Sequence, residues 1–184
     1  MKSAARLTLA LAALMVMNMS FAKPPLDLVE SIDLDRYQGR WYEIALLPNR
    51  FQKRCVSDTS ARYTLRGDGQ IQVINRCRQA DGRQARVEGV ARLADPDGSS
   101  AALEVRFAPR WLSWLPFVWG DYRVIALGED YDYAMVGSDN RRYLWILSRS
   151  SVLDETTLTG LKAQAAAQGF PVDKLQMTPQ LDDA

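Results

Sequence analysis

The sequence predicts an all-β fold, an eight-stranded antiparallel up-and-down β-barrel with one C-terminal α-helix packed on the barrel. Short segments of alternating apolar and polar residues recur at regular spacing, and glycine, aspartate, asparagine or proline separates them. The short turns favour antiparallel neighbours, because parallel pairing needs long crossovers. Closing eight strands removes both sheet edges and leaves room for one small ligand. A β-sandwich is the alternative architecture.

Residues 1–22 are typical of a secretory signal peptide, after which residues 23–184 would form a single domain. Lys2 and Arg6 give a basic start, an apolar stretch follows, and small residues precede an expected cleavage after Ala22. The apolar stretch is shorter than the roughly 20 residues of a membrane-spanning helix. An uncleaved anchor is the alternative.

Eight segments are expected to form the strands. They are residues 40–47, 57–65, 70–77, 84–94, 101–107, 122–127, 132–137 and 142–148. The third segment shows the alternation well, since Ile71 and Val73 follow Gln70 and Gln72. Residues 67–69 (Gly-Asp-Gly) form a typical turn before it.

One helix is expected between Asp154 and Gly169. Asp154 is a good N-cap, and Gly169 with Pro171 after it ends the pattern. The apolar residues at helical spacing are Leu158, Leu161 and Ala165, which give the helix one face for packing on the barrel. We expect the tail after residue 177 to be loose.

The composition excludes several classes of function. The chain has no histidine, which excludes Ser-His-Asp and Cys-His catalysis and histidine ligands for zinc or haem. We expect no metal and no cofactor. The net charge of +1 gives no sign of a nucleic-acid partner. In an exported protein the two cysteines, Cys55 and Cys77, are expected to form a disulfide, with free thiols as the alternative.

Three short motifs mark the ends of predicted strands. They are Gly39-Arg40-Trp41-Tyr42, Asp132-Tyr133 and Arg149. Their order and spacing resemble the signature segments of the lipocalin family. The wider phrases 39–45 and 143–149 look like the bacterial outer-membrane lipocalins and their apolipoprotein D and plant temperature-induced relatives. The resemblance runs from about residue 33 to residue 176.

The resemblance implies a structural role for the motif residues Gly39, Trp41, Asp132, Tyr133 and Arg149. In that family the matching tryptophan and arginine pack together at the closed end of the barrel. A guanidinium stacked on an indole contributes about 1 kcal/mol or more when it is desolvated. We therefore assign these residues to the fold and not to catalysis.

The sequence departs from the family pattern at two places. The bacterial relatives are typically lipoproteins with a cysteine at the cleavage site, whereas residues 20–23 read Ser-Phe-Ala-Lys. This implies a soluble periplasmic or secreted protein, with outer-membrane association as the alternative. The second departure is mild, since Tyr131 stands where the family usually has threonine before Asp132-Tyr133.

Residues 108–119 hold three of the five tryptophans and two prolines. Prolines make a long central strand improbable here, so the segment is expected to connect the fifth and sixth strands at a barrel end. It would either fold onto the barrel as a cap or expose an apolar tip for a membrane, a partner or a ligand. The residues of that tip are Trp111, Leu112, Trp114, Leu115 and Phe117.

The alternation of strand side chains predicts which residues face the interior. If Arg149 points inward, Trp145 and Tyr143 do too, and Glu43 accompanies Trp41. The expected ligand-lining residues are Trp145, Tyr143, Trp119, Phe107, Val105, Asn75, Tyr63 and Glu43. Phe107 and Trp119 would lie near the mouth, and Glu43, Tyr143 and Asn75 would orient the ligand. The alternative for each residue is that it fills the closed end.

The function that these observations favour is non-catalytic binding and storage or transport of a lipid in the bacterial cell envelope. The ligand would be a fatty acid, a lysophospholipid or a similar amphiphile, and the tryptophan-rich segment would give peripheral membrane contact. One alternative is a lipocalin-fold enzyme of isomerase or de-epoxidase type, which would use carboxylates, tyrosine or lysine. The other is a protein-interaction module that uses the tryptophan-rich segment.

Overall fold

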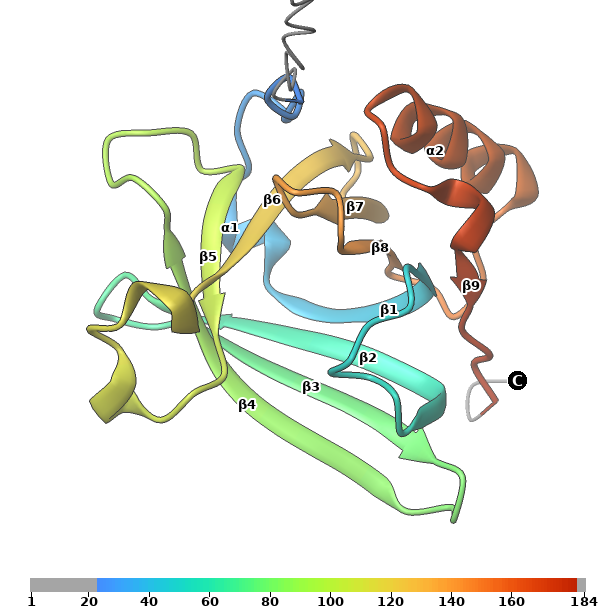
Figure 1. Cartoon of the computed structure of the whole chain (residues 1–184), viewed down its shortest axis with the longest axis horizontal. Coiled ribbons are helices and arrows are strands. Elements are labelled where there is room, and N and C mark those ends of the chain that lie inside the picture. The colour runs from blue at the N-terminus through green and yellow to red at the C-terminus, as the bar shows by residue number, and fades with distance from the viewer. Residues whose placement is uncertain (1–22, 182–184) are drawn as a thin grey trace, which may run out of the picture.

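A closed antiparallel β-barrel dominates the computed structural model, which describes residues 23–181. Its strands are neighbours in the order β2-β3-β4-β5-β6-β7-β8-β1-β9, and β2 also pairs with β1, so β1 to β8 close on themselves (Figure 1). The predicted eight-stranded up-and-down barrel is confirmed, and the sandwich alternative is wrong. The expected signal peptide lies outside the described residues.

The strands agree with the segments that the sequence predicted, and their ends differ by no more than two residues. They are β1 (Gly39–Leu46), β2 (Cys55–Leu65), β3 (Ile71–Gln79), β4 (Gln84–Leu93), β5 (Ala102–Arg106), β6 (Gly120–Leu127), β7 (Tyr133–Gly137) and β8 (Leu144–Ser148). Strands β2, β3 and β4 project beyond the rest of the barrel (Figure 1). Strand β5 pairs with β4 only from Val90 to Leu93, which leaves the far half of β4 without that neighbour.

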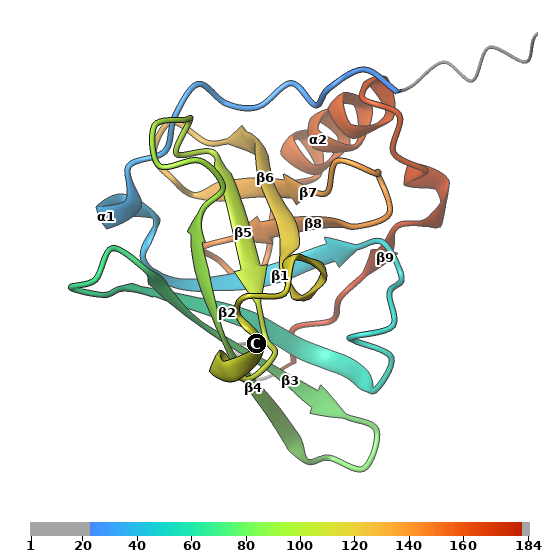
Figure 2. The ribbon, with the colours of Figure 1, turned by 60° about the vertical axis from the view of Figure 1, so that its left-hand side comes forward.

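Helix α2 (Glu155–Ala167) packs on the outside of the barrel, as predicted. The Asp154 carboxylate accepts a hydrogen bond from the Thr157 amide, and Leu161 and Ala165 are buried. They lie in one apolar cluster with outward-facing residues of the strands, among them Ile146 of β8. Figure 2 shows α2 beside β6 and β7.

A short helix that the sequence analysis did not predict, α1 (Leu34–Tyr37), lies at one end of the barrel. The Asp33 side chain begins it by accepting hydrogen bonds from the amides of Asp35 and Arg36. Tyr37 is buried, and its carbonyl accepts a hydrogen bond of 2.9 Å from the indole of Trp41. This end of the barrel is therefore closed by α1 and the aromatic residues beneath it.

The other end carries four connections, at residues 47–54, 80–83, 107–119 and 138–143. The first of them crosses toward β8, because Gln52 accepts a hydrogen bond from Trp145. The connection 107–119 contains the 3₁₀ helices η1 (Arg110–Leu112) and η2 (Pro116–Val118), in agreement with the expectation that it forms no strand. A third 3₁₀ helix, η3 (Val172–Lys174), follows α2.

The expectation of a loose C-terminal tail is wrong for residues 178–181, and residues 182–184 lie outside the described residues. Strands β1 and β2 pair only up to Tyr42 and Ser60, and the tail fills the gap beyond that point. Strand β9 (Gln176–Met177) pairs with β1, and the following amides and carbonyls bond to both strands. Backbone hydrogen bonds of this kind need no side-chain periodicity, so the sequence pattern gave no sign of them.

Candidate functional site

The closed end of the barrel is built around Arg149. Its Cζ lies 3.8 Å from the centroid of the Trp41 ring. Its guanidinium also donates hydrogen bonds of 2.8 Å to the carbonyls of Arg36 and Arg40 and of 3.2 Å to that of Tyr131. The contact expected between Trp41 and Arg149 is thus confirmed, and the guanidinium joins four segments of the chain.

The other motif residues lie at the same closed end of the barrel, around Arg149. Gly39 has a φ of +94°, and a Cβ there would lie 3.2 Å from an Arg149 nitrogen, so both the backbone and the space favour glycine. The Asp132 carbonyl accepts a hydrogen bond of 2.7 Å from the Arg149 amide. Tyr133 begins β7 and pairs with Ser148.

Three tyrosine hydroxyls form a buried chain above this closure. The hydroxyl of Tyr122 lies 2.9 Å from that of Tyr37 and 2.9 Å from that of Tyr63. Burial raises the pKa of Tyr63 to about 12 and raises the pKa values of Tyr37 and Tyr122 as well. These hydroxyls therefore hold their protons at neutral pH. Tyr63 is buried among the other aromatic residues of the closed end. Filling of the closed end is the alternative that the sequence analysis gave for this residue.

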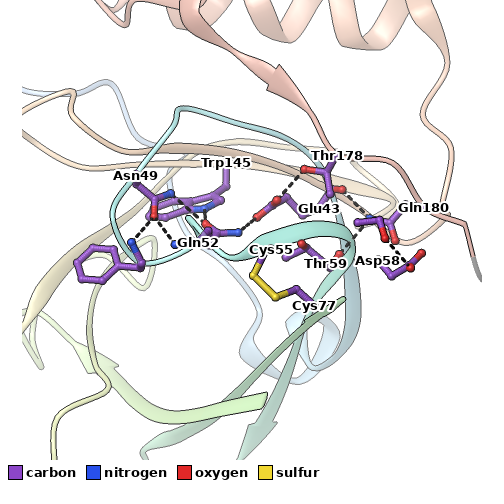
Figure 3. Close-up of a disulfide and its surroundings, with 12 residues drawn as sticks. Glu43, Asn49, Gln52, Cys55, Asp58, Thr59, Cys77, Trp145, Thr178 and Gln180 are labelled. Atoms are coloured by element: carbon purple, nitrogen blue, oxygen red, sulfur yellow. Dashed lines mark hydrogen bonds between the residues drawn. A yellow bond between two sulfur atoms is a disulfide. The ribbon is translucent and has the colours of Figure 1, made fainter. Parts of the chain in front are cut away.

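The opposite, open end contains a polar chain inside the barrel wall (Figure 3). The Trp145 indole donates a hydrogen bond of 2.8 Å to Gln52 Oε1, and Gln52 Nε2 donates one of 2.5 Å to Glu43 Oε2. Glu43 Oε1 accepts a bond of 2.7 Å from the Thr178 hydroxyl. The chain therefore links β8, the first connection, β1 and the tail.

The direction of these hydrogen bonds is fixed by groups that can only donate. Asn49 Oδ1 accepts from the amides of Phe51 and Gln52, so Asn49 Nδ2 must donate to Gln52 Oε1. The Trp145 indole also donates to Gln52 Oε1. Gln52 is thereby left to donate through Nε2, and Glu43 must accept. The network holds Glu43 in the role of an acceptor.

Glu43 itself is buried, with 4% of its surface exposed. Burial raises the pKa of this carboxyl group, and the hydrogen bonds from Gln52 and Thr178 oppose the rise. A bulge in β1 between Glu43 and Ala45 changes which side chains face inward. Glu43 lines a pocket, whereas Ala45, which strict alternation would place on the same face as Glu43, lies in the outer cluster under α2.

The pocket beside Glu43 has a volume of about 390 Å³. Its walls come from the end of β1, residues 48–53, the start of β2 and residues 176–179 of the tail. Arg50 and Lys53 also line it, and both are exposed. Gln52 and Thr178 were not among the predicted residues, because neither a loop nor a tail carries a periodic pattern that could have indicated them.

Aromatic rings continue the inner face of β8 toward the mouth. The rings of Tyr143 and Trp145 stack with centroids 5.8 Å apart and an interplanar angle of 9°. Phe51 of the first connection lies 5.7 Å from Tyr143. Trp145 packs against the interior cluster that contains Leu147, so the predicted alternation along β8 is confirmed.

Three further predicted residues follow the inward alternation. Val105 packs against the interior cluster. Asn75 lies opposite Ala61 on β2, and its buried Oδ1 has no hydrogen-bond partner among the described residues. The Phe107 ring covers Gly89, where an added Cβ would come within 2.6 Å of it. Asn75 therefore presents an unsatisfied polar atom within the barrel wall.

Trp119 does not lie where the sequence analysis expected it. Its ring lies 3.9 Å from Arg92 Cζ and 5.2 Å from Arg106 Cζ. Arg92 pairs with Glu104 on the outer face, since the adjacent Ala91 and Leu103 are in the interior cluster. The placement of Trp119 over the mouth is therefore wrong, because two arginines hold the indole on the outside.

The connection 107–119 folds back with its aromatic side chains in solvent. Trp111, Trp114 and Phe117 are 73%, 76% and 79% exposed, while Leu112 and Leu115 are half-buried. The Trp119 indole donates a hydrogen bond of 2.8 Å to the Ser113 carbonyl and ties the two halves of the connection together. A groove of about 550 Å³ with several arginines lies beneath it.

The predicted disulfide is confirmed. Cys55 and Cys77 are bonded, with their Cα atoms 5.5 Å apart, and the bond fixes the start of β2 to β3 beside the pocket (Figure 3). Among residues 23–181 no group of three metal-ligating side chains is found. No helix within the same residues is long and apolar enough to cross a membrane.

Sequence comparisons with known proteins agree on one family, and a solved structure shares the fold. A family model described as a lipocalin-like domain matches residues 32–180. Temperature-induced lipocalin-1 of Arabidopsis thaliana is 42% identical over 161 residues, covering 87% of this chain and 86% of that protein. The outer membrane lipoprotein Blc of Citrobacter freundii is 40% identical over 167 residues, covering 89% of each. Insecticyanin from the tobacco hornworm Manduca sexta has a TM-score of 0.65 at 22% identity, covering 88% of this chain and 87% of that one.

Proposed function

The chain belongs to the lipocalin family, and from this premise we propose that it binds and stores or transports a lipid in the bacterial cell envelope. Membership is consistent with a lipid or another small hydrophobic ligand. Within that class we propose a fatty acid, a lysophospholipid or a similar amphiphile. Apolar burial in a preformed barrel supplies the affinity.

The observation that carries the proposal is the difference between the two ends of the barrel. Trp41, Tyr37 and Tyr63 are buried and pack against one another at one end. The other end combines the Trp145 ring, the buried Glu43 carboxylate and a pocket of about 390 Å³. An amphiphile suits such a gradient, since its chain prefers apolar walls and its head group needs polar partners.

The test is binding by protein purified without detergent. Native mass spectrometry would detect a co-purifying amphiphile, and titration with oleate or an oleoyl lysophospholipid would change tryptophan fluorescence. We expect saturable binding at a stoichiometry of one. The absence of saturable binding with every amphiphile would contradict the proposal and favour the interaction-module alternative.

The location is a further part of the proposal. A relative at 40% identity is named an outer membrane lipoprotein, and residues 1–22 have the pattern of a signal peptide without a lipoprotein cysteine. We propose release into the periplasm or medium after cleavage behind Ala22. Amino-terminal sequencing of the exported protein tests this, and an intact Met1 would contradict it.

We also propose that the protein contacts a membrane surface through the tip formed by Trp111, Trp114 and Phe117. Aromatic side chains that are about three-quarters exposed favour the membrane interface over water. Arg110 lies in the tip itself, and Arg66, Arg92 and Arg106 line the adjoining groove together with Asp68 and Glu88. The arginines outnumber the carboxylates there, which suits anionic head groups.

Catalysis is the competing function. Glu43 is the carboxylate that an isomerase or de-epoxidase reaction could use here, whereas burial raises the pKa values of Tyr37, Tyr63 and Tyr122 and makes these hydroxyls poor proton donors at neutral pH. Mass spectrometry of the ligand before and after incubation with the protein separates the two. A carrier returns the ligand unchanged.

A further inference from the structure

Glu43 is a buried carboxylate without an ion-pair partner among residues 23–181. Arg50 and Lys53 line the same pocket, yet neither forms an ion pair with it. The groups that contact the carboxylate, Gln52 and Thr178, are uncharged. Burial of a carboxylate is costly without a counter-charge. Such groups concentrate at functional sites, where a bound ligand can supply the missing counter-charge.

The surrounding network maintains this state. Gln52 is oriented by the Trp145 indole and by Asn49, so that it presents an N–H to Glu43. Each carboxylate oxygen accepts one of the two hydrogen bonds and can accept another. The site is therefore preorganised for a further donor on the pocket side.

We propose that this pocket is a head-group subsite in which Glu43 binds the ammonium group of a zwitterionic amphiphile. The proposal rests on the proposed function and names its ligand class. Arg50 and Lys53 at the exposed side of the pocket would bind the anionic group of the same head. A phosphoethanolamine head group carries both charges in adjacent positions. The two signs of charge in the pocket thus match a zwitterion better than a fatty acid.

The experiment compares three lipids with one acyl chain. They are oleoyl lysophosphatidylethanolamine, oleoyl lysophosphatidic acid and mono-oleoylglycerol. A hydrogen bond to a charged group changes affinity by about tenfold or more. The wild-type protein should bind the zwitterion tightest, and Glu43→Gln should weaken its binding about tenfold while mono-oleoylglycerol stays within about twofold.

Glu129→Gln is the matched control, because it removes the same charge from an exposed position at the closed end. It should change none of the three affinities. If Glu43→Gln fails to fold, a measurement on the wild-type protein still tests the proposal. N-acetylation of the lysophosphatidylethanolamine removes its ammonium charge and should weaken binding about tenfold.

The outcomes separate the two proposals. If no lipid binds saturably, the proposed function fails and the subsite fails with it. If the lipids bind but the acetylated and unacetylated forms bind alike, lipid binding stands and the role of Glu43 is overturned. Equal weakening of all three lipids by Glu43→Gln would also overturn it, since that pattern marks a structural residue.

Discussion

The guanidinium of Arg149 covers the indole of Trp41 at 3.8 Å, and residues 108 positions apart in the chain thereby close one end of the barrel. The same guanidinium donates to three carbonyls. The stacking and the hydrogen bonds of Arg149 together join α1, β1 and the end of β8. Their free energy therefore stabilises the fold.

The first prediction concerns this closure. Trp41→Ala removes a fully buried ring and should cost roughly 3–5 kcal/mol of unfolding free energy. Arg149→Ala should cost about 2 kcal/mol or more, since the stacking and the hydrogen bonds to carbonyls are lost together. Urea denaturation measures both, and the order of ligand affinities should stay unchanged. A variant that keeps its stability but loses binding would contradict the structural assignment.

The buried tyrosines predict alkaline sensitivity. Burial raises the pKa of Tyr63 from 10.0 to about 12, so between these values the folded state holds a proton that the unfolded state has lost. The stability contribution is complete below pH 10 and falls as the pH rises toward 12. Denaturation at several pH values measures the slope, which should be shallower in Tyr122→Phe.

The disulfide gives a third prediction. Denatured but unreduced protein should show no reactive thiol, and two reactive thiols per chain would contradict the bond. Replacing both Cys55 and Cys77 by serine should lower the unfolding free energy by about 3 kcal/mol, because the crosslink restricts the unfolded chain. Thermal denaturation with and without reductant provides the measurement.

Trp145 is predicted to contact the ligand. Its ring faces the interior cluster, so Trp145→Ala should weaken amphiphile binding by roughly tenfold, which corresponds to about 1.4 kcal/mol. Trp145→Phe should keep much of the affinity and reduce the fluorescence change. Trp111→Phe, which replaces an exposed indole, is the control and should preserve the change. Unaltered affinity in Trp145→Ala would reject the contact.

The exposed tip is predicted to bind membranes. Substituting Trp111, Trp114 and Phe117 together by serine should reduce sedimentation with anionic vesicles severalfold, while stability stays within about 0.5 kcal/mol per site. Val152→Ser removes an apolar side chain of similar exposure, 75%, elsewhere and should have no effect. Equal sedimentation of the tip variant and the wild type would favour a protein partner or no partner.

Sequence reasoning was most accurate where side chains alternate. The inward positions of Trp145, Val105 and Asn75 follow from period-two patterning, and the N-cap at Asp154 from local chemistry. It lost accuracy where geometry depends on distant contacts. The bulge after Glu43 turns the Ala45 side chain to the outer face of the barrel, and no residue type in this segment indicates a bulge.

The candidate site shows the same limit. Gln52 and Thr178 complete the polar chain at Glu43, yet they come from a loop and a tail whose placement depends on tertiary contacts. Trp119 was misplaced for a related reason, because its position is set by Arg92 and Arg106 on other strands. Tyr122 could have been found, since it shares the inward alternation of Val124 in β6.

The segment at residues 176–181 also has a consequence for self-association. Strand β1 separates from β2 after Tyr42, and bare amides and carbonyls there would offer a template to strands of other molecules. Strand β9 and the following residues occupy those groups. Deletion of this segment would thus expose these backbone groups of β1 and favour domain swapping and aggregation.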